Sequence, residues 1–172
     1  MFEQRVQGKW LKWMSLTPME LESNMPHIAA ARGTVVVAGL GMGFFVYNIL
    51  RKPEVTRVVV LEKDANLVTL FNKAIRRNQW PRLDKFELTL GDALQFVPKH
   101  NVDFLYADIW SHLGDETALA KTQAIQANVK AALKLLALAA GPVQVTQWYW
   151  QKLCSARSIQ GCHMMPAPCQ ML

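Results

Sequence analysis

The strongest constraint on the fold comes from an apolar run that leads directly into a glycine-rich turn. Residues 35–38 are three valines and an alanine, and residues 39–43 read Gly-Leu-Gly-Met-Gly. A short run of β-branched apolar residues is typical of a strand that is buried on both faces. Glycines at alternate positions let the backbone reverse and enter a helix, because glycine adopts positive φ without a Cβ clash. The sequence therefore predicts a strand–turn–helix unit whose helix spans residues 44–51.

The alternation of strand and helix continues along the chain. Residues 57–62 predict a second buried strand, and Asp64 is placed to cap a helix that runs to residue 77. Later elements are expected, in chain order, as strands at 86–90 and 102–107, a long helix at 115–140 and a strand at 143–150. Strands that alternate with helices pair in parallel through right-handed crossovers. We therefore predict an α/β fold: a Rossmann-like, doubly wound, mostly parallel sheet with helices on both faces.

Length and composition are those of a globular chain. It has 172 residues, of which 51% are hydrophobic and 19% are charged, close to the globular average. A chain of this length buries roughly 70% of its accessible surface on folding. We expect one domain over 1–172, with short helical pieces or a lid at 1–33, the ligand-binding core at 34–150 and a C-terminal segment at 151–172.

Charge, cysteine content and hydropathy bear on partners and compartment. The 19 basic and 13 acidic residues give a net charge of +6, which suits an anionic partner but also occurs in many domains that bind none. The three cysteines, Cys154, Cys162 and Cys169, match neither a disulfide framework nor a zinc site. The longest apolar stretch falls short of the roughly 20 residues that span a bilayer. We expect a cytoplasmic protein with no membrane segment and no metal.

Candidate functional residues stand at the expected carboxyl ends of four strands. They are the glycine turn at 39–43, Glu62, Asp92 and Asp108. In open parallel sheets, ligands bind beyond the carboxyl ends of the strands, near the point where the strand order reverses. The sequence therefore predicts one ligand site assembled from these four positions.

Each of the three acids has two open roles. Glu62 would accept both hydroxyl protons of a ribose, or would be a solvated acid at a strand end. Asp92 would hydrogen bond to an adenine amine, or would cap a helix that begins at the next residue. Asp108 would orient or deprotonate an amine, or would cap the segment that follows it.

The spacing of the glycines bears on the kind of nucleotide. A dinucleotide fingerprint needs Gly-x-Gly-x-x-Gly, but Phe44 or Val46 stands at the third glycine here, depending on the starting point. A phosphate-binding P-loop is absent as well, because no Gly-Lys-Ser/Thr follows the turn. The turn therefore points to a nucleoside with a tail that is not a phosphate.

Taken together, residues 35–43, 58–64, 91–93 and 102–108 resemble the core of class I S-adenosylmethionine-dependent methyltransferases, closest to the spermidine synthase-like branch. In that branch the first strand is wholly apolar before its glycines, and Glu-x-Asp follows the second strand. Here Val37 stands where most class I enzymes carry an acid, and residues 62–64 read Glu-Lys-Asp. The resemblance extends from residue 35 to about residue 150.

The resemblance implies a function and a set of site residues. The glycines would line the methionine and ribose of S-adenosylmethionine, Glu62 would hold the ribose hydroxyls, and Asp92 would meet the adenine. Asp108 matches the position of the catalytic aspartate. The expected cofactor-binding residues are Gly39, Leu40, Gly41, Gly43, Glu62, Lys63, Asp92, Ala93 and Asp108. We expect a methyltransferase of unknown acceptor, a small molecule in the simplest case, with a fold reduced at its C-terminus.

Other functions and partners stay open. The alternatives are an aminopropyltransferase-like (polyamine synthase-like) enzyme, a non-catalytic methyltransferase-like module that serves in protein association, and a nicotinamide dinucleotide oxidoreductase, which the glycine spacing disfavours. The basic stretch at 76–82 would contact nucleic-acid phosphates, with Trp80 stacking, or would place cations at a helix end. The aromatic residues 148–150 would line a substrate pocket or a homodimer surface, or would belong to a buried strand.

Overall fold

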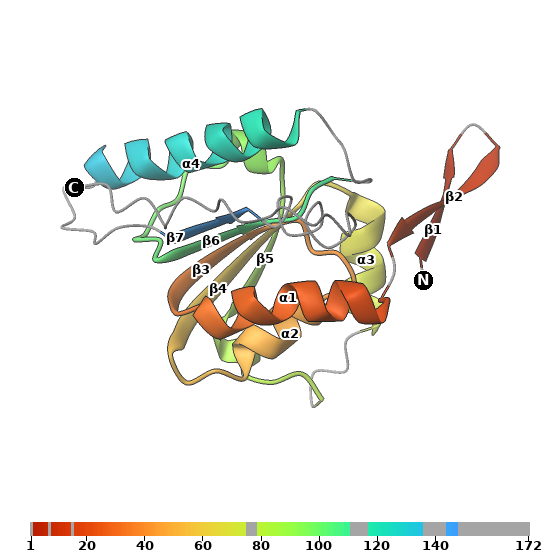
Figure 1. Cartoon of the computed structure of the whole chain (residues 1–172), viewed down its shortest axis with the longest axis horizontal. Helices are drawn as coiled ribbons and strands as arrows, with labels where there is room; N and C mark the ends of the chain where they lie inside the picture. Colours follow the sequence, from red (N-terminus) through yellow and green to blue (C-terminus); the bar gives the residue numbers. More distant parts are fainter. Residues whose placement is uncertain are drawn as a thin grey trace, which may run out of the picture.

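The computed structural model describes residues 2–6, 8–14, 16–74, 79–110, 117–135 and 144–147 of the chain (Figure 1). The described elements are, in chain order, β1 (Phe2–Val6), β2 (Lys9–Met14), α1 (Pro18–Ala30), β3 (Gly33–Ala38), α2 (Phe44–Leu50), β4 (Val55–Glu62), α3 (Ala65–Ala74), the 3₁₀ turn η1 (Leu83–Lys85), β5 (Phe86–Leu90), the 3₁₀ turn η2 (Ala93–Gln95), β6 (Phe104–Ala107), α4 (Ala118–Leu135) and β7 (Gln144–Gln147). No helix among these residues is long and apolar enough to span a bilayer.

Within the described residues, five parallel strands form the main sheet, in the order β5-β4-β3-β6-β7. Val36, in the middle of the central strand, lies opposite Val59 of β4 and Leu105 of β6. From β3 the chain builds outward through β4 and β5, then crosses back to β6 and β7 on the other side. The strand order therefore reverses between β3 and β6, the place where open parallel sheets bind ligands. This order confirms the predicted doubly wound α/β fold.

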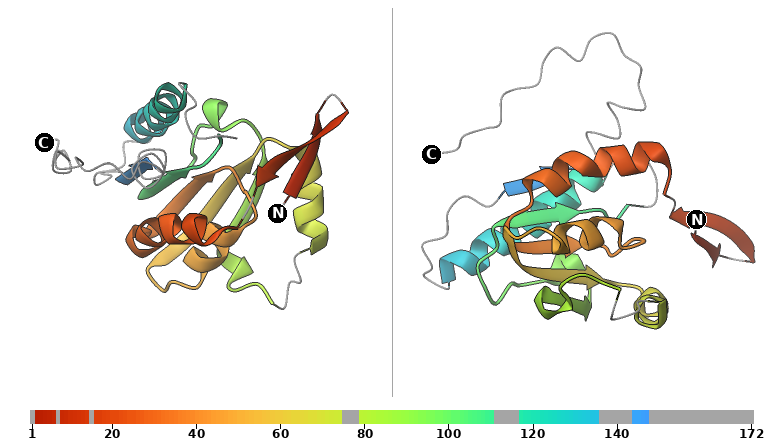
Figure 2. Two further views of the ribbon diagram at one scale, coloured as in Figure 1. Left: turned by 45° about the vertical axis from the view of Figure 1, so that its right-hand side comes forward. Right: turned by 90° about the horizontal axis from the view of Figure 1, so that it is seen from below.

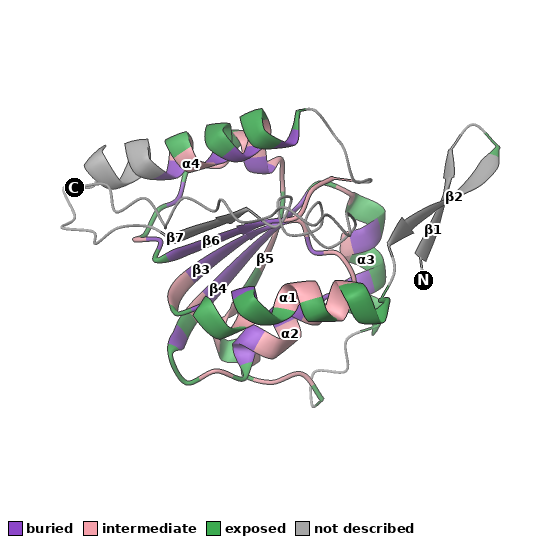
Figure 3. Ribbon diagram, in the orientation of Figure 1, coloured by how far each residue is buried: buried purple, intermediate pink, exposed green. Residues whose placement is uncertain are grey.

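Helices cover both faces of the sheet, because successive side chains of a strand point to opposite faces. Val35 and Val37 pack with apolar residues of α1, α2 and α3, whereas Val36 and Ala38 pack with those of α4. Figure 1 shows α1 and α2 on one side of the sheet and α4 on the other. The residues of β6 and most of β3 are buried (Figure 3). A strand that is buried on both faces is apolar throughout, which is the pattern that the sequence shows.

The N-terminal segment differs from the prediction. Residues expected to form short helical pieces or a lid begin instead with an antiparallel hairpin, β1–β2, which belongs to a separate two-stranded sheet (Figure 2). Gly8 makes the turn with a φ of 82°. The sequence of β2 does not alternate regularly between apolar and basic residues, so it lacks the two-residue period that predicts a strand. The helix α1 follows, with Pro18 in its first turn and Thr17 as N-cap in a capping box with Glu20.

The ends of the predicted helices need smaller corrections. Asp64 caps α3 as expected, because its Oδ1 accepts from the backbone N–H of Asn66 at 2.7 Å. The helix predicted after Asp92 is only the single 3₁₀ turn η2. Helix α2 ends one residue before the predicted boundary, and Arg51 is its C-cap. The predicted ends of the helices at 65–77 and 115–140 lie partly outside the described residues.

Lys52 ties the end of α1 to the loop after α2, and its loss is expected to destabilise the protein. The Lys52 Nζ donates to the carbonyls of Ile28, Ala29 and Ala31 at 2.7, 2.6 and 2.7 Å. A cation at a helix C-terminus also interacts favourably with the helix dipole. Lys52→Met keeps most of the aliphatic part of the side chain but removes the ammonium group that donates to these three carbonyls. We expect a loss of about 2 kcal/mol in the free energy of unfolding, measured by urea denaturation.

The control for this prediction is Lys99→Met, because Lys99 is exposed on a loop. A substitution at such a position is expected to change the free energy of unfolding by less than about 0.5 kcal/mol. Equal effects of the two substitutions would show that the three carbonyl contacts of Lys52 contribute nothing measurable.

Candidate functional site

The predicted site residues gather at the carboxyl edge of the main sheet. The backbone N–H of Gly39 donates to Leu61 O at 2.8 Å, that of Asp108 donates to Ala38 O at 2.9 Å, and that of Gly91 donates to Glu62 O at 2.9 Å. These bonds extend the sheet ladder by one residue beyond β3, β6 and β5. The glycine turn, Glu62, Asp92 and Asp108 therefore lie along one edge, on both sides of the reversal in strand order.

The glycine turn has the backbone conformation for which glycine is needed. The φ angles of Gly39, Gly41 and Gly43 are 91°, 57° and 76°, all in the left-handed region. A Cβ at Gly39 would collide with the backbone carbonyl of Asp108, so the turn and the end of β6 are in direct contact. A Cβ at Gly43 would lie 3.1 Å from the rings of Phe71 and Trp80. The turn is thus packed from behind, and its glycines place bare backbone at the carboxyl edge.

Glu62 is buried and holds the glycine turn in place. Its residue is only 7% exposed, so the interpretation as a solvated acid is wrong. One carboxylate oxygen accepts from the backbone N–H of Leu40 at 3.0 Å, and the other accepts from that of Asp64 at 2.8 Å. An ionised carboxylate has about four acceptor sites on its two oxygens. The two hydrogen bonds from backbone amides therefore leave acceptor capacity for two further donors, such as a pair of hydroxyls.

Asp92 has the capping role that the sequence left open. Its Oδ1 accepts from the backbone N–H of Leu94 at 2.9 Å, at the start of η2. Its Oδ2 lies 3.5 Å from the Nζ of Lys63, whose side chain is 80% exposed. The ion pair joins two of the predicted cofactor-binding residues, and Ala93 next to them is buried. Contact between Asp92 and an adenine stays a prediction.

Asp108 lies beside a tyrosine that sequence reasoning did not select. Burial, and then the charge of Asp108, raise the pKa of the Tyr106 phenol well above its ordinary value. Tyr106 is 2% exposed, and its hydroxyl donates to Asn24 Oδ1 of α1 at 2.8 Å. A hydroxyl within an apolar strand, two residues before a candidate acid, was the available signal in the sequence. Nothing in the sequence pairs Asn24 with it.

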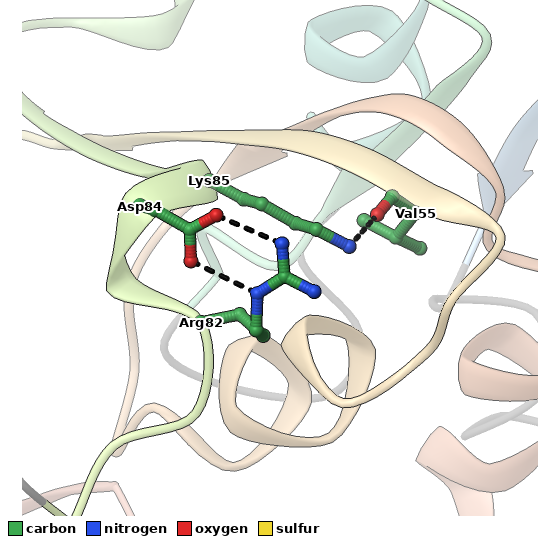
Figure 4. Close-up of polar contacts among 4 residues, drawn as sticks. All are labelled: Val55, Arg82, Asp84 and Lys85. Atoms are coloured by element: carbon green, nitrogen blue, oxygen red, sulfur yellow. Dashed lines mark hydrogen bonds and ion pairs between the residues drawn. The ribbon is translucent and has the colours of Figure 1, made fainter.

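Arg82, the last residue of the basic stretch, lies near the opposite edge of the sheet, where β4 begins. Arg82 forms two hydrogen bonds to Asp84, Nε to Oδ1 at 3.0 Å and Nη2 to Oδ2 at 2.9 Å (Figure 4). This pairing raises the pKa of Arg82 and lowers that of Asp84. The next residue, Lys85, donates to the carbonyl of Val55, the first residue of β4 (Figure 4). The guanidinium of Arg82 is thus already paired with a carboxylate of its own loop.

Of the remaining aromatic and cysteine residues that the sequence analysis considered, the structure describes Trp80. The Trp80 ring packs edge-on against the rings of Tyr47 and Phe71, with centroids 5.5 and 4.9 Å away, so it belongs to an aromatic cluster next to the glycine turn. Residues 75–78, the aromatic residues 148–150 and the three cysteines lie outside the described residues.

Among known proteins, the chain matches solved structures but no protein-family model and no curated sequence. The solved complex of DhpI with SAM and HEP is 19% identical, with 72% of this chain and 50% of that chain covered and a TM-score of 0.47. The N-methyltransferase NodS from Bradyrhizobium japonicum WM9 is 17% identical, with coverages of 67% and 62% and a TM-score of 0.48. The glycopeptide N-methyltransferase MtfA in complex with S-adenosylmethionine is 21% identical, with coverages of 66% and 48% and a TM-score of 0.48. The chain thus spans about half the length of the DhpI and MtfA chains.

Proposed function

We propose that the protein binds S-adenosylmethionine at the carboxyl edge of β3, β4, β5 and β6 and transfers its methyl group to an acceptor held near Asp108. The observation that carries the proposal is the junction of Glu62 with the glycine turn. A buried carboxylate accepts from one amide of the turn, that of Leu40, and from the amide of Asp64, and it keeps acceptor capacity for two hydroxyls. The turn follows β3, which borders the reversal in strand order, and ligands bind near this point in open parallel sheets.

The residues present fit the chemical groups of this cofactor. The turn has no side chains at Gly39, Gly41 and Gly43, whose positive φ angles shape it, so its bare backbone would admit close approach of a flat nucleoside and its amino-acid tail. Glu62 supplies charged acceptors for ribose hydroxyls, and Asp92 stands at the end of the neighbouring strand for the adenine. The bound cofactor would supply an electrophilic methyl group, so the chain mainly has to align an acceptor with it. Asp108 would orient that acceptor or take its proton.

Two of the alternatives are less well supported. A nicotinamide dinucleotide requires a pyrophosphate cradle that this glycine spacing lacks. We do not propose aminopropyl transfer, because residues 111–114 read Ser-His-Leu-Gly, whereas the spermidine synthase-like branch continues from its aspartate into Asp-Pro and a glycine. A small molecule is the simplest acceptor, since the internal pairing of Arg82 offers no support for nucleic acid.

The proposed cofactor is tested by thermal unfolding with S-adenosylhomocysteine, the demethylated product, and with NAD as the control. A ligand at 100 times its Kd stabilises the folded state by about 2.7 kcal/mol, which corresponds to a rise of about 5–10 °C in Tm for a chain of this size. We expect this rise with S-adenosylhomocysteine and none with NAD. Equal shifts with both ligands, or no shift with either, would contradict the proposal.

The non-catalytic module is separated from the enzyme by a second measurement. Transfer of a labelled methyl group is followed with a panel of small amines, carboxylates and nucleic acids as acceptors. We expect turnover with at least one class. Cofactor binding by calorimetry without turnover on any of them would favour a module that serves in protein association.

A further inference from the structure

Helix α1 reaches the edge of the sheet where the candidate site lies. Its last residue, Ala30, is followed closely by Gly33, which starts β3 and pairs with Val55 at the start of β4. The C-terminus of α1 is therefore at the amino edge of the sheet, and the helix runs back toward that edge from the carboxyl side (Figures 1 and 2). A helix of 13 residues is about 20 Å long, as long as the strand that it covers. The first turns of α1 thus lie beside the carboxyl edge.

A buried tyrosine joins α1 to the strand that carries Asp108. Tyr106 donates its hydroxyl hydrogen to Asn24 Oδ1 at 2.8 Å. The amide nitrogen of Asn24 donates to the Glu20 carbonyl at 2.7 Å, so the orientation of the accepting oxygen is set by the helix itself. His27, one turn further along α1, is 6% exposed, and its ring centroid lies 5.6 Å from that of Tyr106. Helix α1 therefore docks on Tyr106 through a hydrogen bond and an aromatic contact.

The same ring supports the helix behind the glycine turn. Tyr106 and Phe45 are stacked, with ring centroids 3.9 Å apart and planes 13° apart. Phe45 is the second residue of α2, which begins directly after Gly43. Tyr106 also precedes Asp108 by two positions, and the charge of Asp108 acts on its phenol. One side chain thus connects α1, the start of α2 and the end of β6.

We propose that Tyr106 is a positioning residue of the candidate site. Its hydroxyl holds the first two turns of α1 as the wall on the acceptor side, and its ring holds the start of α2 behind the glycine turn. The assignment of α1 to the side of the site that holds the methyl acceptor rests on the proposed function. Burial and the Asp108 charge raise the pKa of the phenol, so the hydroxyl keeps the proton that it donates to Asn24 at neutral and mildly alkaline pH.

The hydroxyl is tested with Tyr106→Phe, which keeps the ring and its stack on Phe45. We expect hydrogen exchange in α1, followed by mass spectrometry, to become about three- to tenfold faster, as for the loss of one buried hydrogen bond. Exchange in β3 and β4 should not change. The affinity for S-adenosylhomocysteine, measured by calorimetry, should fall about threefold or more. Asn24→Ala removes the same bond from a half-buried position, together with the Asn24 bond to the Glu20 carbonyl, and should have at least these effects. Adding Tyr106→Phe to Asn24→Ala should cause no further change.

Thr122→Val is the matched control. The buried Thr122 hydroxyl donates to Ala118 O at 2.9 Å within α4, on the other face of the sheet. Its loss should leave both the exchange of α1 and the ligand affinity unchanged. Unaltered exchange in α1 of both Tyr106→Phe and Asn24→Ala would overturn the inference, whether or not any cofactor binds. Absence of S-adenosylhomocysteine binding by the unsubstituted protein would instead overturn the proposed function.

A spectroscopic measurement separates positioning of the site from general stabilisation. The chain has 3 tyrosines, so labelling their ζ carbons with ¹³C gives a simple spectrum, in which Tyr106→Phe identifies the Tyr106 signal. We expect this signal to shift when S-adenosylhomocysteine binds and when Asp108 is replaced by Asn. A Tyr106 signal that responds to neither change would contradict a role in the site, even if Tyr106→Phe lowered the stability.

Discussion

Replacing Asp108 by Asn is expected to lower methyl-transfer turnover by about 10²–10⁴-fold, the usual contribution of a positioned proton acceptor. The affinity for S-adenosylhomocysteine should stay within about threefold. Asn is nearly isosteric with Asp but carries no charge and takes no proton. The backbone N–H of Asp108 continues the sheet ladder to Ala38 O, and this bond does not depend on the side chain. The substitution therefore tests the carboxylate alone.

The outcome separates three roles of Asp108. If the side chain only caps the following segment, Asn would cap nearly as well and neither stability nor turnover would change. Loss of affinity together with stability would show that Asp108 maintains the fold. The matched control is Asp103→Asn on the amino side of the same strand, where the carboxylate accepts from the backbone N–H of Thr34 at 2.7 Å. Asn can accept the same bond, so turnover of this variant should be unchanged.

Glu62→Ala is expected to weaken S-adenosylhomocysteine binding by about 2–4 kcal/mol, or about 30- to 1000-fold, because two charge-assisted hydrogen bonds to the ribose would be lost. The substitution also removes the acceptors of the Leu40 and Asp64 amides. A lower free energy of unfolding should therefore accompany the loss of affinity, and urea denaturation and calorimetry measure the two effects separately.

The control for Glu62 is Glu87→Ala on the neighbouring strand. Glu87 pairs with Arg57 at 2.6 Å, but their side chains are 49% and 39% exposed, and exposed pairs contribute about 0–1 kcal/mol to stability. We expect no change in affinity for this variant. Unchanged affinity in a folded Glu62→Ala variant would mean that Glu62 only holds the turn, and the proposed ribose contact would be wrong.

The central strands and the site edge were predictable because they depend on local patterns. A strand buried on both faces needs an unbroken apolar run, and residues 35–38 and 58–61 show one. A sharp turn out of that strand needs residues that accept positive φ, and the three glycines supply them. Once parallel pairing is inferred, all carboxyl ends share one edge, so the sequence alone predicts that the glycine turn, Glu62, Asp92 and Asp108 lie together.

The hairpin β1–β2 and the turn η2 were not predictable in the same way. A two-stranded hairpin shows only a weak period in its sequence, and the tryptophans and lysines of residues 9–14 alternate irregularly. The segment after Asp92 has a capping residue, which predicts the start of a helix but not its length. Helix length depends largely on tertiary packing of an apolar face, and here the 3₁₀ turn instead leads into the loop before β6.

The sequence by itself determined the fold class and the edge of the sheet at which a ligand site forms, since both follow from hydrophobic periodicity and from the conformations open to glycine. Only the tertiary structure decided the state of the side chains at that edge. It buried Glu62 against two backbone amides and brought Asn24 to the hydroxyl of Tyr106, 82 positions away. Such contacts depend on the packing of α1 and of the turn against the finished sheet, and no local pattern records which distant polar group will satisfy a buried one.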